Sequence, residues 1–224
     1  MSDEVYSLDN AELRNSARYS SNSTVLNVAK RAFDLLGATL GIILLSPLLL
    51  CLAIAIKATS KGPILFKQKR YGLNNIMFTT YKFRSMYLDR CDQTGVQQTV
   101  KDDPRITRVG NFLRRSNFDE LPQLINVLKG EMSIVGPRPH VPGMLANGVP
   151  YEDFDPRYLS RHQVKPGITG LAQVNGFRGE TKNAYAASMR LHFDLEYIRT
   201  RSMTLDLKII VNTIIKEFFK GNGY

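Results

Sequence analysis

Cysteine and histidine are scarce in this sequence, and none of the few has the spacing of a metal, redox or triad site. The chain has 224 residues, with two cysteines and three histidines. Cys51 lies in an apolar segment and Cys91 in a polar stretch. They therefore predict no disulfide, which is consistent with a reducing compartment. His140, His162 and His192 have no partner at the spacing of a zinc site or a catalytic triad.

Common nucleotide-binding and hydrolase motifs are also absent. The sequence has no Walker motif, dinucleotide fingerprint or Gly-x-Ser-x-Gly, and its first residues do not read as a signal peptide. The net charge is +10, which favours a polyanionic partner such as nucleic acid, anionic lipid or a phosphorylated substrate. No zinc finger or basic zipper is present. We therefore expect lipid headgroups and phosphates as partners, and no nucleic acid.

The one long apolar segment runs from Asp34 to Lys57 and reads DLLGATLGIILLSPLLLCLAIAIK. As a continuous helix it would be roughly 30 Å long, enough to cross a bilayer. Ser46 and Pro47 lie at its midpoint. Because proline frees the carbonyl four residues earlier, at Ile43, we expect a break here, with Ser46 as one candidate partner for that carbonyl.

The flanks of this segment predict that it turns back within the membrane. Basic residues mark the cytoplasmic side of a membrane segment, and both flanks are basic, with Lys30 and Arg31 before it. The basic residues that follow are Lys57, Lys61, Lys67, Lys69 and Arg70. A helix-break-helix that enters and leaves through the same leaflet satisfies both flanks. A kinked spanning helix is the alternative.

Three regions follow from this pattern. Residues 1–25 are polar and rich in Ser and Asn, and are predicted to be a mobile tail. Residues 26–57 form the re-entrant membrane helix. Residues 58–224 are of a size suited to one catalytic domain on the cytoplasmic face. The predicted fold class is an α/β type, mainly helical with short strands, in a monotopic membrane protein.

Helical periodicity recurs in the second half of the chain. Apolar residues from Leu121 to Leu128 keep helical spacing up to Gly130, and Asn117 is a candidate N-cap. Residues 184–200 predict a second helix. The last predicted helix, 204–220, is amphipathic, which suits either packing against the domain or lying in the membrane interface.

The strongest candidate for catalysis is the pair Asp119-Glu120. Adjacent carboxylates at a helix start are often capping residues, but Arg114 and Arg115 precede this pair and Arg138 follows it between two prolines. Arginine suits a bidentate grip on phosphate. A carboxylate can attack phosphorus as a nucleophile, and a second carboxylate can hold Mg²⁺.

Two further segments carry candidate binding residues. Lys82 and Arg84 alternate with aromatics in YKFRSM, which fits either phosphate binding or an amphipathic strand with solvated charges. Gln173 and Asn175 lie in the glycine-rich run GITGLAQVNG, where they could bind a base or sugar. A structural turn explains these glycines equally well.

Five blocks of the sequence, in this order, resemble the bacterial sugar transferase family, the monotopic polyprenyl-phosphate phosphoglycosyl transferases. The blocks are KRAFDLLGATLGIILLSPLLL, KFRSM, TRVGNFLRRSNFDELPQLINVLKGEMSIVGPRP, PGITGLAQVNG and FDLEYIRTRSMTLDLKII. The resemblance covers roughly residues 26–219 and fits the minimal form of the family.

The resemblance implies a reaction and its cofactor. The family transfers a sugar 1-phosphate from a UDP-sugar to undecaprenyl phosphate and releases UMP, through a covalent phosphosugar on the dyad aspartate, here Asp119. It implies that Glu120 binds Mg²⁺ and that Arg138 contacts phosphate. The family's basic positions fall on Arg114, Lys82 and Arg84.

The resemblance also implies a membrane location. The late aspartate of the family falls on Asp194, with Asp206 as a weaker match, and Ser46-Pro47 falls on its re-entrant hinge. The expected location is the cytoplasmic face of the bacterial inner membrane. Similarity to exopolysaccharide-type members over NGFRGET favours glucose or galactose as the sugar, and a homodimer is a further expectation. The alternative function is a non-catalytic basic scaffold for the polysaccharide machinery.

Overall fold

A computed structural model describes residues 24–90 and 103–220 and has a mixed helix and strand fold that is 58% helical. The predicted tail of residues 1–25 lies outside the described residues, apart from its last two. The helices are α2 (Thr24–Thr59), α3 (Arg108–Arg115), α4 (Gln123–Lys129), α5 (Tyr151–Phe154), α6 (Leu171–Val174), α7 (Ala184–Thr200) and α8 (Met203–Lys220). The short 3-10 helices are η2 (Leu73–Asn75), η3 (Leu88–Arg90), η4 (Phe118–Glu120) and η5 (Tyr158–Gln163). The strands are β1 (Leu65–Tyr71), β2 (Met77–Phe83), β3 (Ser133–Val135), β4 (Leu145–Ala146), β5 (Val149–Pro150) and β6 (Gly167–Thr169). The prediction of a mainly helical protein with short strands is confirmed.

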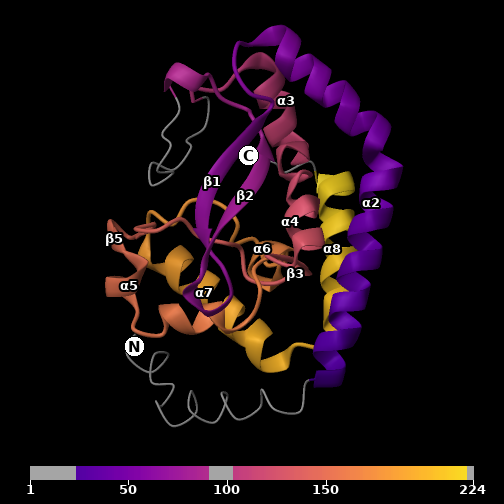
Figure 1. The fold of residues 1–224 in the computed structure, drawn as a ribbon. Coiled ribbons are helices and arrows are strands. Elements are labelled where there is room, and N and C mark those ends of the chain that lie inside the picture. Colours follow the sequence, from indigo (N-terminus) through magenta and orange to yellow (C-terminus); the bar gives the residue numbers. More distant parts are fainter. Residues whose placement is uncertain (1–23, 91–102, 221–224) are drawn as a thin grey trace.

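The apolar segment forms one helix, α2, and in the described part of the chain it alone is long and apolar enough to cross a membrane. Pro47 lies inside it. The predicted break is instead a bend, and the ribbon changes direction about midway (Figure 1). The Ser46 hydroxyl donates a hydrogen bond of 2.8 Å to the Ile43 carbonyl. This contact satisfies the acceptor that Pro47 frees, as the sequence predicted.

Both halves of α2 pack against the rest of the protein. In the first half, Ala38 is buried with Val127. In the second half, Leu52 and Ile56 are buried with Leu113 of α3. Other large apolar side chains of α2 stay exposed, namely Leu36, Leu40, Ile43, Leu44, Leu50 and Ile54. The helix is therefore docked along one side and apolar on the other.

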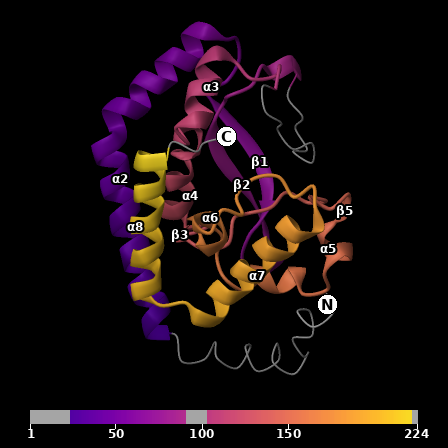
Figure 2. The same ribbon diagram turned by 180° about the vertical axis from the view of Figure 1, so that it is seen from behind.

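Polar side chains fix the first half of α2 to the strand that leads into the site. Asp34 accepts hydrogen bonds from the Ser133 hydroxyl and the Ile134 amide of β3. Lys30 pairs with Asp206 of α8, which lies alongside α2 in both views (Figure 1 and Figure 2). Position and tilt of α2 are thereby coupled to β3.

Three small sheets position the remaining elements. β1 and β2 form an antiparallel hairpin, which crosses the middle of the molecule (Figure 1). β3 pairs in parallel with β6, and β4 pairs antiparallel with β5. A side chain at Gly136 or Gly167 would collide with the backbone of the other segment. These two glycines therefore serve the close approach of β3 and β6.

Candidate active site

The dyad Asp119-Glu120 lies in a short 3-10 turn between α3 and α4. Asn117 adopts a left-handed conformation with φ of 57° and turns the chain after α3. The turn η4 follows, and α4 begins only at Gln123. Asn117 therefore precedes a 3-10 turn rather than capping the α-helix, because its φ redirects the backbone. Asp119 and Glu120 are 7% and 6% exposed.

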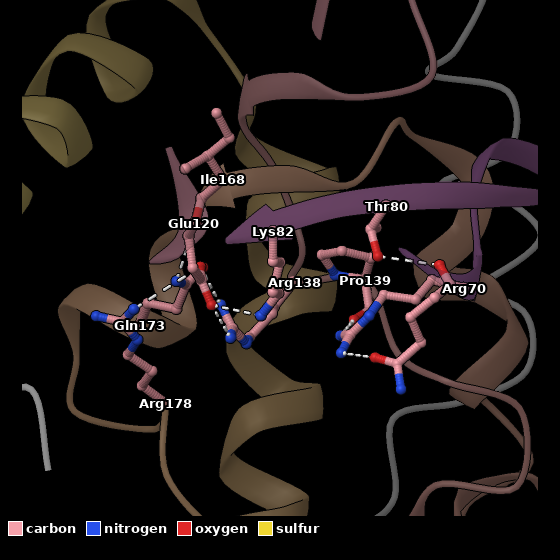
Figure 3. A network of polar contacts seen from close by, with 10 residues as sticks. Arg70, Thr80, Lys82, Glu120, Arg138, Pro139, Ile168, Gln173 and Arg178 are labelled. Carbon is pink, nitrogen blue, oxygen red and sulfur yellow. Dashed lines mark hydrogen bonds and ion pairs between the residues drawn. The ribbon is translucent and has the colours of Figure 1, made fainter. Parts of the chain in front are cut away.

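Glu120 is surrounded by cationic side chains from three other segments. Its carboxylate accepts a hydrogen bond of 2.8 Å from Lys82 Nζ and two from Arg138, of 3.0 and 2.5 Å. Arg178 lies 3.8 Å away (Figure 3). Burial opposes ionisation, but the charges of Arg138 and Lys82 outweigh it and hold the pKa of Glu120 well below its usual range.

Asp119 has a different environment although it is the next residue. Within residues 24–90 and 103–220, no group donates a hydrogen bond to its carboxylate. Burial and the negative charge of Glu120 raise the pKa of Asp119, while Lys82, Arg114 and Arg138 act in the opposite direction. One carboxylate is therefore held by cations, and the other has oxygens available for reaction.

The cations around the dyad suit an anionic ligand. Burial is the main cause that lowers the pKa of Lys82 to about 8 and that of Arg70 to about 10. Nearby Arg138 lowers both further. Lys82, Arg70, Arg138 and Arg178 outnumber the two carboxylates. An incoming diphosphate would supply the negative charge that this cluster lacks.

Four of the predicted site residues make contacts away from the carboxylates of the dyad. Arg84 donates to the Ser60 and Lys61 carbonyls beyond the end of α2. Asp194 is 2% exposed and pairs with Arg161. The other two residues, Gln173 and Asn175, lie in the glycine-rich run.

In that run, Gln173 donates a hydrogen bond of 3.2 Å to the Ile168 carbonyl, and the side chain lies near Arg178 (Figure 3). Asn175 is exposed and donates to the Leu171 carbonyl. Substrate binding by Arg84, Asp194, Gln173 and Asn175 stays a prediction, whereas Lys82, Arg138 and Glu120 are brought into direct contact. Arg114 lies close enough to influence Asp119.

Sequence reasoning missed three arginines of this region. Arg178 faces Glu120, Arg70 lies beside Arg138, and Arg161 donates to the Arg138 carbonyl. The sequence could have indicated Arg178, because it lies between glycines in the run NGFRGET, which resembles exopolysaccharide-type members of the family. Arg70 was interpreted only as a flanking charge of the membrane segment.

Mg²⁺ binding by Glu120 stays a prediction, because both of its carboxylate oxygens accept hydrogen bonds from Lys82 or Arg138 in this structure. Among the described residues, no group of three or more His, Cys, Asp or Glu side chains could hold a metal ion alone. Mg²⁺ commonly binds through one or two carboxylates plus substrate phosphates. Asp119 and Glu120 supply such oxygens, and those of Asp119 accept no hydrogen bond from the described residues.

Comparison with known proteins identifies the class of this site. Residues 25–220 match the model of the family described as bacterial sugar transferase. The chain belongs to this family. The match spans the dyad, the cations around it and α2, so the family resemblance of the sequence is confirmed.

Individual proteins of known name are also similar to this chain over most of its length. An exopolysaccharide production protein of Rhizobium leguminosarum bv. phaseoli is 51% identical over 88% of this chain and 98% of its own length. An undecaprenyl-phosphate glucose phosphotransferase of Komagataeibacter xylinus is 51% identical over 87% of this chain and 37% of its own length. A UDP-glucose:undecaprenyl-phosphate glucose-1-phosphate transferase of Escherichia coli (strain K12) is 49% identical over 90% and 43%. The chain thus spans about two-fifths of the length of the last two relatives.

Proposed function

We propose that this protein transfers a hexose 1-phosphate from a UDP-sugar to undecaprenyl phosphate and releases UMP, as the first membrane step of exopolysaccharide or related glycan assembly. The names of the Komagataeibacter and Escherichia relatives support glucose as the sugar, with galactose as the second candidate. The observation that carries the proposal is the contrast within the dyad. Asp119 has available oxygens, and Glu120 is held by Lys82 and Arg138.

In the first half of the reaction, an Asp119 carboxylate oxygen attacks the phosphorus that bears the sugar. A new bond forms between this oxygen and phosphorus, and the bond to the bridging oxygen breaks. That oxygen leaves with its electron pair as part of UMP. The negative charge of the diphosphate is attracted by Lys82, Arg138 and Arg178, which lets an anionic nucleophile approach an anionic substrate.

In the second half, a phosphate oxygen of undecaprenyl phosphate attacks the same phosphorus. The bond between phosphorus and Asp119 breaks, and the carboxylate is restored. Mg²⁺, held by Glu120, would neutralise phosphate charge when it is bound. Arg114 favours the ionised form of Asp119, which each cycle requires.

The acceptor is a lipid, so the site must stay at the height of the headgroups. We infer that α2 is re-entrant and holds the protein on the cytoplasmic face of the bacterial inner membrane. Two observations support this: both halves of α2 pack against the same folded unit, and its flanks are basic. A spanning helix would carry one of these packed halves across the bilayer.

The test is UMP release from a panel of UDP-sugars in the presence of undecaprenyl phosphate and Mg²⁺. We expect release with UDP-glucose or UDP-galactose, and a labelled covalent adduct when the lipid acceptor is omitted. Asp119→Asn should abolish both signals. If exopolysaccharide production persists in cells that carry Asp119→Asn, the protein is the non-catalytic scaffold instead.

A further inference from the structure

The segment that carries Arg138 is held by its backbone carbonyls. Arg161 Nη2 donates a hydrogen bond of 2.7 Å to the Arg138 carbonyl. Arg70 Nη1 donates one of 2.5 Å to the carbonyl of Pro139 (Figure 3). The Tyr71 amide donates one of 2.9 Å to the His140 carbonyl. Three consecutive carbonyls therefore have donors from other parts of the chain.

This arrangement follows from the prolines on either side of Arg138. Proline has no backbone N–H, so Pro137 and Pro139 cannot be anchored through amides. Their carbonyls remain as attachment points, and the Gly167 amide donates to the Pro137 carbonyl at 2.9 Å. The backbone on both sides of Arg138 is thereby fixed.

Arg161 is itself held in place by Asp194. It is 1% exposed, and its Nε and Nη2 donate to Asp194 Oδ2 at 3.0 and 2.6 Å. A buried guanidinium needs a carboxylate partner and offers a rigid, planar set of donors. Because Asp194 fixes the plane of the guanidinium, the second hydrogen bond of Nη2 is directed to the Arg138 carbonyl.

Arg70 supports the same segment from the hairpin. Its Nη2 donates to Gln68 Oε1 at 2.6 Å, on the same strand β1. The pKa of Arg70 is lowered by burial and by the positive charge of Arg138. Arg70 and Arg138 are thus held close together, and Arg138 donates a hydrogen bond to Glu120.

We propose that Arg161, oriented by Asp194, and Arg70 are positioning residues that hold Arg138 in the geometry needed for phosphoryl transfer. Neither arginine touches the dyad carboxylates in the described contacts. Arg161 acts through the carbonyl of Arg138, and Arg70 acts through the carbonyl of the next residue, Pro139. The inference rests on the proposed function, because it concerns the rate of that reaction. It assigns Asp194 a positioning role through Arg161.

The main test is Arg161→Lys, which keeps the charge but cannot reproduce a planar fork with bonds to both Asp194 and a carbonyl. Misplacing a catalytic group by about 1 Å can cost on the order of 100-fold in rate. We expect a fall in kcat of this order for UMP release. The KM for the UDP-sugar should change by less than about threefold, because Lys82 and Arg178 remain.

A double-mutant cycle separates positioning from a general structural role. In an Arg138→Ala background no side chain remains to be positioned, so Arg161→Lys should cause little further loss, measured with radiolabelled UDP-sugar. Arg157→Lys is the matched control, because Arg157 also forms an ion pair, with Asp155, close to the start of η5. It should leave kcat near the wild-type value. If the fold-losses of Arg138→Ala and Arg161→Lys instead multiply in the double variant, the proposal is overturned.

Folding is checked by thermal unfolding of each variant. If Arg161→Lys does not fold, Arg70→Lys decides by the same cycle, because it acts from a different element on the next carbonyl. Two failures are then distinguishable. A wild-type protein without UMP release contradicts the proposed function, whereas an active wild type with independent losses in the cycle contradicts only the positioning role.

Discussion

At the scale of single residues, the adjacent carboxylates of the dyad have opposite effects on stability. The pKa of Glu120 is lowered in the folded state, so its ionised form stabilises the fold above the unfolded pKa of about 4.3. That contribution is lost as pH falls through the folded value. The pKa of Asp119 is raised. Its contribution is present below the unfolded pKa of about 3.9 and is lost as pH rises through the folded value.

This contrast predicts different outcomes for two similar amide substitutions at neutral pH. Glu120→Gln leaves Lys82 and Arg138 without their carboxylate and should lower the free energy of unfolding by on the order of 3 kcal/mol. Asp119→Asn removes a carboxylate that burial disfavours, and should leave stability unchanged or raise it. Chemical denaturation in detergent micelles measures both. Equal losses for the two variants would contradict the assignment of environments.

A second prediction at this scale concerns the pH dependence of the reaction. In the proposed reaction Asp119 must be ionised to attack phosphorus, so the rate should fall on the acidic side as the carboxyl gains a proton. Arg114 lowers the pKa of Asp119. Arg114→Ala should therefore raise that pKa further and move the acidic limb of the kcat/KM profile to higher pH.

The neighbouring Arg115 supplies the control for this profile. It lies on the same helix and is exposed, and Arg115→Ala changes the net charge by the same amount. The acidic limb should stay where it is in the wild type. Identical shifts in the two variants would mean that total charge, and not the position of Arg114, sets the ionisation of Asp119.

At the scale of elements, the sequence predicted what depends on local pattern. Residues 184–200 and 204–220 were expected as helices and correspond to α7 and α8. The sequence also singled out the dyad, because its motif is contiguous, and the catalytic role of the dyad stays a prediction. Contacts between segments that are distant in the sequence could not be predicted from a local residue pattern. Arg161 and Arg70 act on backbone carbonyls 23 and 69 residues away, and every residue has a carbonyl, so no residue pattern marks the acceptor.

The tie between α2 and β3 leads to a prediction about Asp34. It accepts hydrogen bonds from Ser133 Oγ at 3.0 Å and from the Ile134 amide at 2.9 Å, and is 2% exposed. Asp34→Ala leaves these donors without a partner inside the protein, and should cost about 1–3 kcal/mol in the free energy of unfolding. Asp34→Asn keeps an acceptor oxygen and should lose less. Thermal unfolding compares the two, and equal losses would show that the hydrogen bonds contribute little.

At the scale of the whole molecule, the bend of α2 and its docking determine where the site sits. Pro47 alone permits either a kinked spanning helix or a re-entrant one. The docking of α2 supports the proposed re-entrant form, because Ala38 in the first half and Leu52 in the second are buried against the same folded unit. Moving the first half through the bilayer would draw the charged anchors Lys30 and Arg31 away from their partners. Moving the second half would break its packing against Leu113.

Cysteine labelling tests this topology. With Cys51 and Cys91 replaced by alanine, single cysteines are introduced at Ala29 and Lys67, which are both exposed and flank the apolar segment. A membrane-impermeant maleimide should label neither position in intact spheroplasts and both in inverted vesicles, with lysed cells as the control for reactivity. Labelling from opposite sides would mean that α2 spans the bilayer. A spanning α2 would separate the basic anchors from the domain that they contact, so it would also require a different docking of α2 on β3.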